Sequence, residues 1–239
     1  MLIAFLFQFL SSVMEPVVNA FSFNGINAIE LNDHKAILAT LKTESPNDFC
    51  CKVNISPATP GLTYILDDTN ISDGDSLYHM DCRKPYSLVI MNGTDTLTQK
   101  CVMFTSLPVV CLSTDSQTVT KDIPIKAHLS ITDPEKRTDG TEVYASDIML
   151  KLRGATASIL PKKSFNITLD KSTDVFGIRN DDKWILDAMA VDVSRMRNRL
   201  CFDLWNEVTG LRDNDMIRNG TKGIYVEVVI DGEYNGYIA

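Results

Sequence analysis

Residues 150–200 constrain the fold of this chain more than any other segment. They combine alternating apolar residues, an Arg-Gly turn, a Pro-Lys-Lys tripeptide, a tryptophan and the start of a basic helix. Side chains of a strand point to opposite faces in turn, so the alternation at residues 148–152 and 165–169 predicts two strands. A third strand is predicted around Trp184, just before the helix.

A helix is expected after these strands. Asp192 or Ser194 can cap it by accepting hydrogen bonds from its first amide groups, and Gly210 can end it. Apolar residues recur every four positions along it, which predicts a side buried against the rest of the domain. This predicted stripe consists of Met196, Leu200, Leu204 and Val208, with Cys201 and Trp205 beside them.

The flanking segments predict more strands. Residues 107–112 form a continuous apolar run, residues 125–131 alternate, and residues 222–239 predict a hairpin. Residues 21–106 show short strands separated by turn residues, typical of a small Ig-like β-sandwich that is either a binding module or a stalk. The expected fold class is therefore α+β, with this sandwich followed over residues 107–239 by an antiparallel sheet and one packed helix, as in a kinase-like small lobe.

The N-terminus predicts export. Residues 2–10 form an apolar run too short to span a bilayer, and Val18-Asn19-Ala20 is a plausible small-residue cleavage site. We therefore predict a signal peptide at residues 1–20, against the alternatives of a misassigned start or a buried helix. No other stretch is long and apolar enough to be a transmembrane segment, so a secreted, periplasmic or cell-surface protein is expected.

Charge and metal-ligating residues exclude some functions. The net charge of −8 leaves no basic surplus to neutralise phosphates, which argues against nucleic acid as a partner. The histidines are scattered without the spacing of a metal site, so no metal ligands are predicted. Six cysteines leave the disulfide pairing open. Cys111 and Cys201 are predicted to be small, free core residues.

Five motifs follow one another in an order that resembles the spore-coat protein H (CotH) kinase family. They are Arg-Gly at 153–154, Pro-Lys-Lys at 161–163, Trp-Ile-Leu at 184–186, Asp-x-Ser-x-x-Arg-Asn at 192–198, and Val-Glu-Val-x-Ile-x-Gly-Glu-Tyr-x-Gly-Tyr at 226–237. The resemblance covers roughly residues 107–239. It departs at the Arg-Gly turn, which the family usually continues with Asn-Ser-Ser; here Ala155-Thr156-Ala157 follows.

The resemblance implies an atypical, secreted or surface-associated protein kinase that uses ATP with Mg or Mn and phosphorylates a protein substrate. In that family the metal-binding and catalytic aspartates lie beyond the Gly-Glu-Tyr hairpin. The chain is therefore expected to be truncated before them, and no catalytic or metal-binding residue is assigned.

Cationic side chains near the turn and tripeptide are the candidate cofactor-binding residues. Phosphoryl transfer needs positive charge over the phosphates, and Arg153, Lys162 and Lys163 cluster in the sequence. Composition alone favours solvated charges that protect a strand edge as the role of the two lysines; the resemblance favours a binding role for one of them. Arg197 and Asn198 complete the candidate set, or else satisfy polar groups of the hairpin and helix end.

Two acidic residues have alternative interpretations. Glu227 could pair with a cleft lysine, as lobe glutamates do in kinases, although an outward-facing strand residue is the simpler expectation. Asp192 is expected to cap the helix rather than to bind metal.

Two functional hypotheses follow. The first is an exported CotH-like kinase polypeptide that carries the nucleotide-binding lobe. The alternative is a surface binding or adhesion protein that uses the same scaffold without catalysis.

Overall fold

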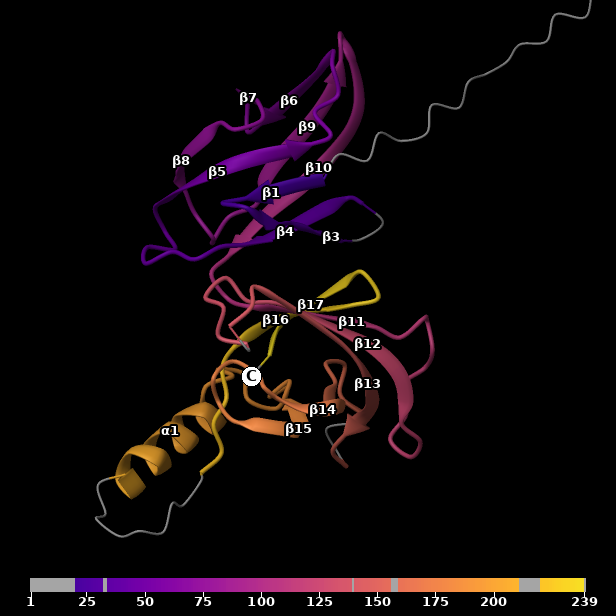
Figure 1. The fold of residues 1–239 in the computed structure, drawn as a ribbon, viewed down its shortest axis with the longest axis vertical. Helices are drawn as coiled ribbons and strands as arrows, with labels where there is room; N and C mark the ends of the chain where they lie inside the picture. The colour runs from indigo at the N-terminus through magenta and orange to yellow at the C-terminus, as the bar shows by residue number, and fades with distance from the viewer. Residues whose placement is uncertain (1–19, 32–33, 139, 156–158, 211–219, 239) are drawn as a thin grey trace, which may run out of the picture.

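The computed structural model describes residues 20–31, 34–138, 140–155, 159–210 and 220–238. The predicted signal peptide lies outside these residues, apart from Ala20. Thr156 and Ala157, in the tripeptide that departs from the family pattern, also lie outside them. The described residues form two stacked units, with one helix projecting from the second unit (Figure 1).

The first unit is a β-sandwich. One sheet has the order β2-β1-β5-β8, from β1 (Ala20–Phe23), β2 (Ile26–Asn27), β5 (Phe49–Ser56) and β8 (Ser76–Met80). The other has the order β3-β4-β10-β9-β6-β7, from β3 (Ile29–Leu31), β4 (Ala36–Thr40), β6 (Leu62–Leu66), β7 (Thr69–Ile71), β9 (Tyr86–Asn92) and β10 (Asp95–Thr105). Neighbouring strands are antiparallel except β4 and β10, which are parallel. The expected β-sandwich is thus present.

Alternating side chains build the core of this sandwich. In β5, Cys51, Val53 and Ile55 are buried while the residues between them are more exposed, as expected for a strand with one face on a core. Phe104 lies at the centre and makes edge-to-face contacts with Phe23, at 4.9 Å between ring centroids, and with Phe49, at 5.5 Å. Such aromatic contacts stabilise the sandwich beyond the area that they bury.

The second unit is a seven-stranded sheet with the order β15-β14-β13-β12-β11-β16-β17. Its strands are β11 (Val109–Ser113), β12 (Ile125–Thr132), β13 (Val143–Arg153), β14 (Ser164–Asp174), β15 (Asn180–Leu186), β16 (Val226–Ile230) and β17 (Glu233–Ile238). The prediction of a purely antiparallel sheet is wrong, because β11 and β16 run parallel. The parallel pairing arises because β16 returns to the sheet only after the helix.

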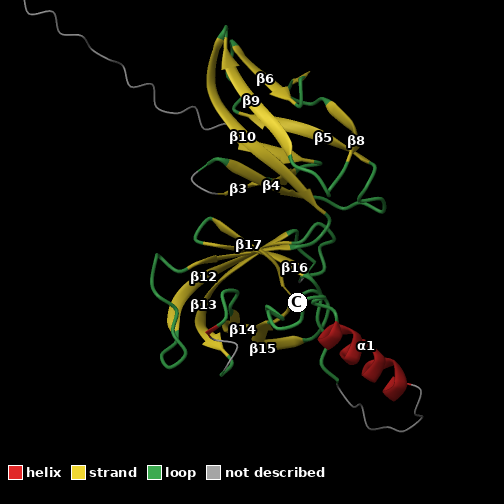
Figure 2. Ribbon diagram, turned by 180° about the vertical axis from the view of Figure 1, so that it is seen from behind, coloured by secondary structure: helices red, strands yellow, loops and turns green. Residues whose placement is uncertain are grey.

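The single helix among the described residues is α1 (Arg197–Gly210), close to its predicted range, but it does not pack as predicted. Leu200, Leu204, Trp205 and Val208 are each 50–55% exposed. The polar side of α1 faces its own unit instead: Arg199 donates a hydrogen bond to the carbonyl of Gly223. In Figures 1 and 2, α1 extends away from the sheet.

The predicted α+β fold class is therefore wrong. The described chain is nearly all β, with strands β1 to β17 in three sheets and one helix that covers none of them. The physical reason lies in α1. Hydrogen bonds to the backbone of residues 221–223 hold its polar side inward, so its apolar stripe is not part of a sheet–helix core. Cys201, predicted to be in the core, is exposed for the same reason.

A small apolar cluster joins the two units. Leu31 and Leu38 of the sandwich pack with Val109 and Val229 of the second sheet, and all four are at most 3% exposed. At the junction, the Thr40 hydroxyl donates to the carbonyl of Leu107 at 2.6 Å. The two units therefore share buried surface, unlike two domains that are connected by a linker alone.

Candidate functional site

A β-bulge in the C-terminal hairpin forms one side of the candidate site. Glu227 pairs with Tyr237 and Val229 with Tyr234, so the register shifts between them. Gly236 lies in this bulge with φ +73°, a left-handed conformation that glycine adopts without the strain a Cβ would add. A Cβ on Gly236 would lie 3.3 Å from Nζ of Lys162. The bulge thus leaves room for the lysine amine beside the hairpin backbone.

Lys162 reaches the hairpin because the sheet curls. It precedes β14, which is separated from β17 by four strands in the sheet order. Residues near opposite edges nevertheless line one cavity: Trp184 and Leu186 from β15, and Val226 from β16. The curled sheet therefore brings the Pro-Lys-Lys segment and the C-terminal hairpin together, although more than sixty positions separate them in the sequence.

Glu227 is the buried acid of this site. It is 9% exposed, and both carboxylate oxygens accept hydrogen bonds. Oε2 accepts from the Tyr234 hydroxyl at 2.7 Å, and Oε1 accepts from the Thr105 hydroxyl at 3.2 Å. The simpler expectation of an outward-facing Glu227 is wrong; its side chain lies on the sheet face turned to the sandwich. A buried carboxylate keeps its charge only when partners of this kind compensate for lost water.

Three influences set the charge of Lys162. Partial burial disfavours the ammonium form, and the positive charge of Arg195 acts in the same direction, whereas the negative charge of Glu227 opposes both. Together they lower the pKa of Lys162 to about 8. Perturbed pKa values of this kind are frequent at functional sites. The amine therefore changes charge close to neutral pH.

The five predicted cofactor-binding residues make different contacts in the structure. Lys162 lies in the site. Lys163 is its half-buried neighbour, and Arg153 is exposed at the end of β13, paired in register with Ser164. Arg197 is 80% exposed and forms an ion pair with Asp192 at 3.6 Å. Asn198 donates to Asp187 at 3.5 Å. Arg197 and Asn198 thus bond to the segment around the start of α1.

Asp192 has the capping geometry expected of it. Its Oδ2 accepts from the backbone amides of Met196 at 3.0 Å and Arg197 at 2.8 Å, and its Oδ1 accepts from the Ser194 hydroxyl at 2.7 Å. These bonds lower the pKa of Asp192 to about 2, and the bond from the Arg197 amide has the largest effect. Asp192 rather than Ser194 therefore caps α1.

Sequence reasoning missed Arg195, Tyr234 and Gly236 as site residues. The latter two belong to the Glu-Tyr-x-Gly-Tyr motif, so the motif could have indicated them. Arg195 is an unspecified position between Ser194 and Arg197 in the helix-start motif. Its backbone carbonyl accepts a hydrogen bond from the Tyr225 hydroxyl at 2.9 Å, which ties the segment before α1 to the segment before β16.

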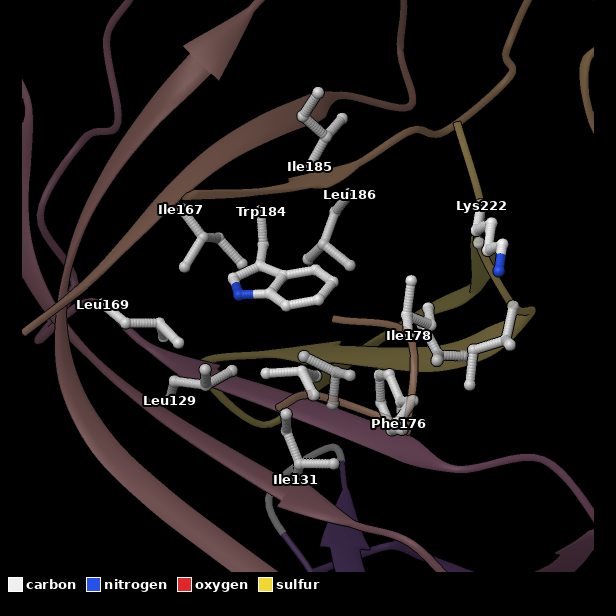
Figure 3. Close-up of a pocket in the computed structure, with 15 residues that line it drawn as sticks. Leu129, Ile131, Ile167, Leu169, Phe176, Ile178, Trp184, Ile185, Leu186 and Lys222 are labelled. Atoms are coloured by element: carbon white, nitrogen blue, oxygen red, sulfur yellow. The ribbon is translucent and has the colours of Figure 1, made fainter. Parts of the chain in front are cut away.

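An apolar cavity of about 80 Å³ lies on the other face of the sheet (Figure 3). Trp184 and Phe176 line it, and Lys222 is its charged lining residue. The side chain of Val226 faces this cavity, and that of the next residue, Glu227, points the opposite way, as alternation in a strand requires. The cavity is therefore separate from the Lys162 site.

Within the described part of the chain, no three or more His, Cys, Asp or Glu side chains gather as a metal site would need. All six cysteines, each in a described segment, carry free thiols. Among the described helices, none is long and apolar enough to cross a membrane.

Comparison with known proteins gives one family. Residues 150–238 match the family model described as CotH kinase protein. The match covers less than half of the chain, but it includes Lys162 and the hairpin with Glu227, and it supports the expected relation to that family. The search of curated proteins found no match.

Proposed function

Because residues 150–238 match the CotH kinase model, we propose that the chain is an exported CotH-like protein kinase polypeptide. Its Ig-like sandwich precedes a unit that binds the phosphates of ATP for phosphoryl transfer to a protein. The observation that carries this proposal is the Lys162 amine, which lies beside the bulge at Gly236 under the influence of the buried Glu227.

The residues of the site suit a phosphate group. Lys162 supplies a positive charge, and Arg195 adds a second cation close enough to act on it. Glycine at position 236 lets the amine lie close to the hairpin backbone, because a Cβ there would be only 3.3 Å from Nζ of Lys162. Bound ATP would supply the phosphoryl group; Lys162 would hold and orient its phosphates through its charge.

The proposal assigns no metal ligand and no catalytic acid to the described residues. Mg or Mn is implied by the family, but the described carboxylates do not form the cluster that such an ion prefers. No step is therefore derived through a metal. Phosphate binding is the function proposed for this part of the chain.

Binding of ATP by the purified chain tests the proposal. We expect Lys162→Ala to weaken binding at least about tenfold, which corresponds to roughly 1.4 kcal/mol, as measured by isothermal titration calorimetry. Lys163→Ala removes the same charge from the adjacent position and is the matched control, with a change of less than about twofold expected. Equal affinities for wild type and Lys162→Ala would contradict the proposal.

One observation favours the second candidate function, a surface binding or adhesion protein without catalysis. The apolar side of α1 is turned to solvent, with Leu204 50% and Trp205 55% exposed, and exposed apolar surface of this kind often marks a protein contact. In that case ATP would bind weakly and equally to wild type and Lys162→Ala.

A further inference from the structure

The hydroxyl of Thr105 connects the β-sandwich with the candidate site. Thr105 is the last residue of β10, in the first unit, and it is 7% exposed. It donates to Oε1 of Glu227 at 3.2 Å, across 122 positions of sequence. We propose that Thr105 is a positioning residue: it holds Glu227 in place so that the sandwich controls the charge of the Lys162 amine. The importance of this control for nucleotide binding rests on the proposed function.

The hydrogen bonds around Thr105 leave its hydroxyl proton with one acceptor. Its hydroxyl oxygen accepts from the backbone amide of Leu107 at 3.1 Å, and its proton goes to Glu227. The backbone of Thr105 is fixed too, because its carbonyl accepts from the amide of Leu41 at 3.1 Å. A hydroxyl held on both sides presents its proton in one direction. The sandwich thus supplies a donor of defined position to the second unit.

The backbone of Glu227 is held at the same junction. Its amide donates to the carbonyl of Pro108 at 2.8 Å. The carboxylate then has two hydroxyl donors, Thr105 from the sandwich and Tyr234 from β17. Loss of either donor leaves a buried carboxylate oxygen short of a partner, a costly state that the side chain can relieve by moving. The placement of Glu227 therefore depends on the sandwich.

The charge of Lys162 responds to that placement. Among the described residues, Arg195 from the segment before α1 and Glu227 from β16 carry charges that act on the amine, and the Tyr234 phenol from β17 donates to Glu227. Glu227 is the group whose charge favours the ammonium form. If it moves, burial and Arg195 act with less opposition, and the amine loses its proton at a lower pH.

Amine labelling of the whole chain measures this effect without ATP. The rate at which an N-hydroxysuccinimide ester acylates Lys162, followed by peptide mass spectrometry from pH 6 to 11, gives the midpoint of its titration. For wild type the midpoint is expected near the pKa of about 8. Thr105→Val keeps the side-chain volume and removes the proton donor. We expect its midpoint to fall by about half a unit, which raises the labelling rate at pH 7 about two- to threefold.

Two matched variants separate positioning from simple docking of the units. Thr105→Ser keeps the hydroxyl and should restore the wild-type midpoint. Thr40→Val removes another hydrogen bond at the junction, from the Thr40 hydroxyl to the carbonyl of Leu107 at 2.6 Å, and should leave the midpoint unchanged. Tyr234→Phe removes the second donor to Glu227 from an exposed position and should lower the midpoint as Thr105→Val does, which tests the inference even if Thr105→Val does not fold.

An unchanged midpoint in Thr105→Val, or in Tyr234→Phe where Thr105→Val does not fold, would overturn the inference. An equal shift in Thr40→Val and Thr105→Val would also overturn it, because unit docking would then explain the effect. Failure of the proposed function looks different: wild type would not bind ATP, while the labelling midpoint would still respond to Thr105.

Discussion

At the scale of single residues, the Lys162 amine illustrates how burial and two charged neighbours together set a charge. Burial and Arg195 favour the neutral amine, and Glu227 favours the ammonium form. The pKa of about 8 is below the ordinary value for lysine, so the amine loses its proton as the pH rises through about 8. A phosphate held by its charge should therefore bind less tightly above that pH than below it.

Arg195→Gln should raise the pKa of Lys162 toward the ordinary lysine value, because it removes a cation that disfavours the ammonium form. The labelling midpoint of Lys162 measures this shift, and the weakening of ATP binding should move to higher pH with it. Arg197→Gln is the matched control: it removes a cation from the same segment, but that cation is 80% exposed and paired with Asp192. A midpoint that moves equally in both variants would contradict the assignment of Arg195.

The sequence could predict only part of this site. The Pro-Lys-Lys motif indicated Lys162, but the motif does not distinguish it from Lys163, since that depends on how the sheet curls. The burial of Glu227 was not predictable from β16 alone. Alternation shows that residue 227 faces away from residue 226. Whether that face meets water or protein is decided by the sandwich, which contacts it through Thr105.

At the scale of elements, α1 shows that an amphipathic pattern does not say which side faces the domain. Its four-residue periodicity predicted the correct element, and Asp192 marks its start. The pattern finds the apolar side. It does not report the hydrogen bonds from Arg199 to Gly223 and from Asn206 to Thr221, which hold the polar side inward.

Leu204→Ala should therefore lower the free energy of unfolding by less than about 1 kcal/mol, because the side chain is already 50% exposed. A leucine buried under the sheet would cost roughly 2–5 kcal/mol when truncated in this way. Urea unfolding followed by circular dichroism distinguishes the two. Leu150→Ala, at a fully buried position of β13, provides the comparison and should show the larger loss. Equal losses at both positions would mean that α1 is packed.

At the scale of the whole molecule, the strands were the most predictable feature and their arrangement the least. Period-two alternation indicated β12, β13 and β14 of the curled sheet, because each keeps one face on a core. The parallel pairing of β11 with β16 and the cluster of Leu31, Leu38 and Val229 arise from contacts between distant segments. No local pattern encodes these contacts, so the sequence alone predicted two separate domains.

The shared cluster predicts that the two units unfold together. Leu38 is 3% exposed and lies in the sandwich, where it packs in the cluster that includes Val109 and Val229 of the second sheet. Both tryptophans, Trp184 and Trp205, belong to the second unit, so their fluorescence reports on that unit. Leu38→Ala, although it changes the sandwich, should lower the free energy of unfolding seen by fluorescence by about 2–5 kcal/mol.

Leu97→Ala is the control for this last experiment, because Leu97 belongs to β10 of the same sandwich but is 41% exposed. It should change the fluorescence-detected transition by no more than about 0.5 kcal/mol. If Leu38→Ala also left that transition unchanged, the units would unfold independently. The sandwich could not then hold Glu227 firmly, since a partner that opens on its own cannot keep a buried donor in place. Cooperative unfolding is thus the physical condition for the Thr105 contact to act on the site.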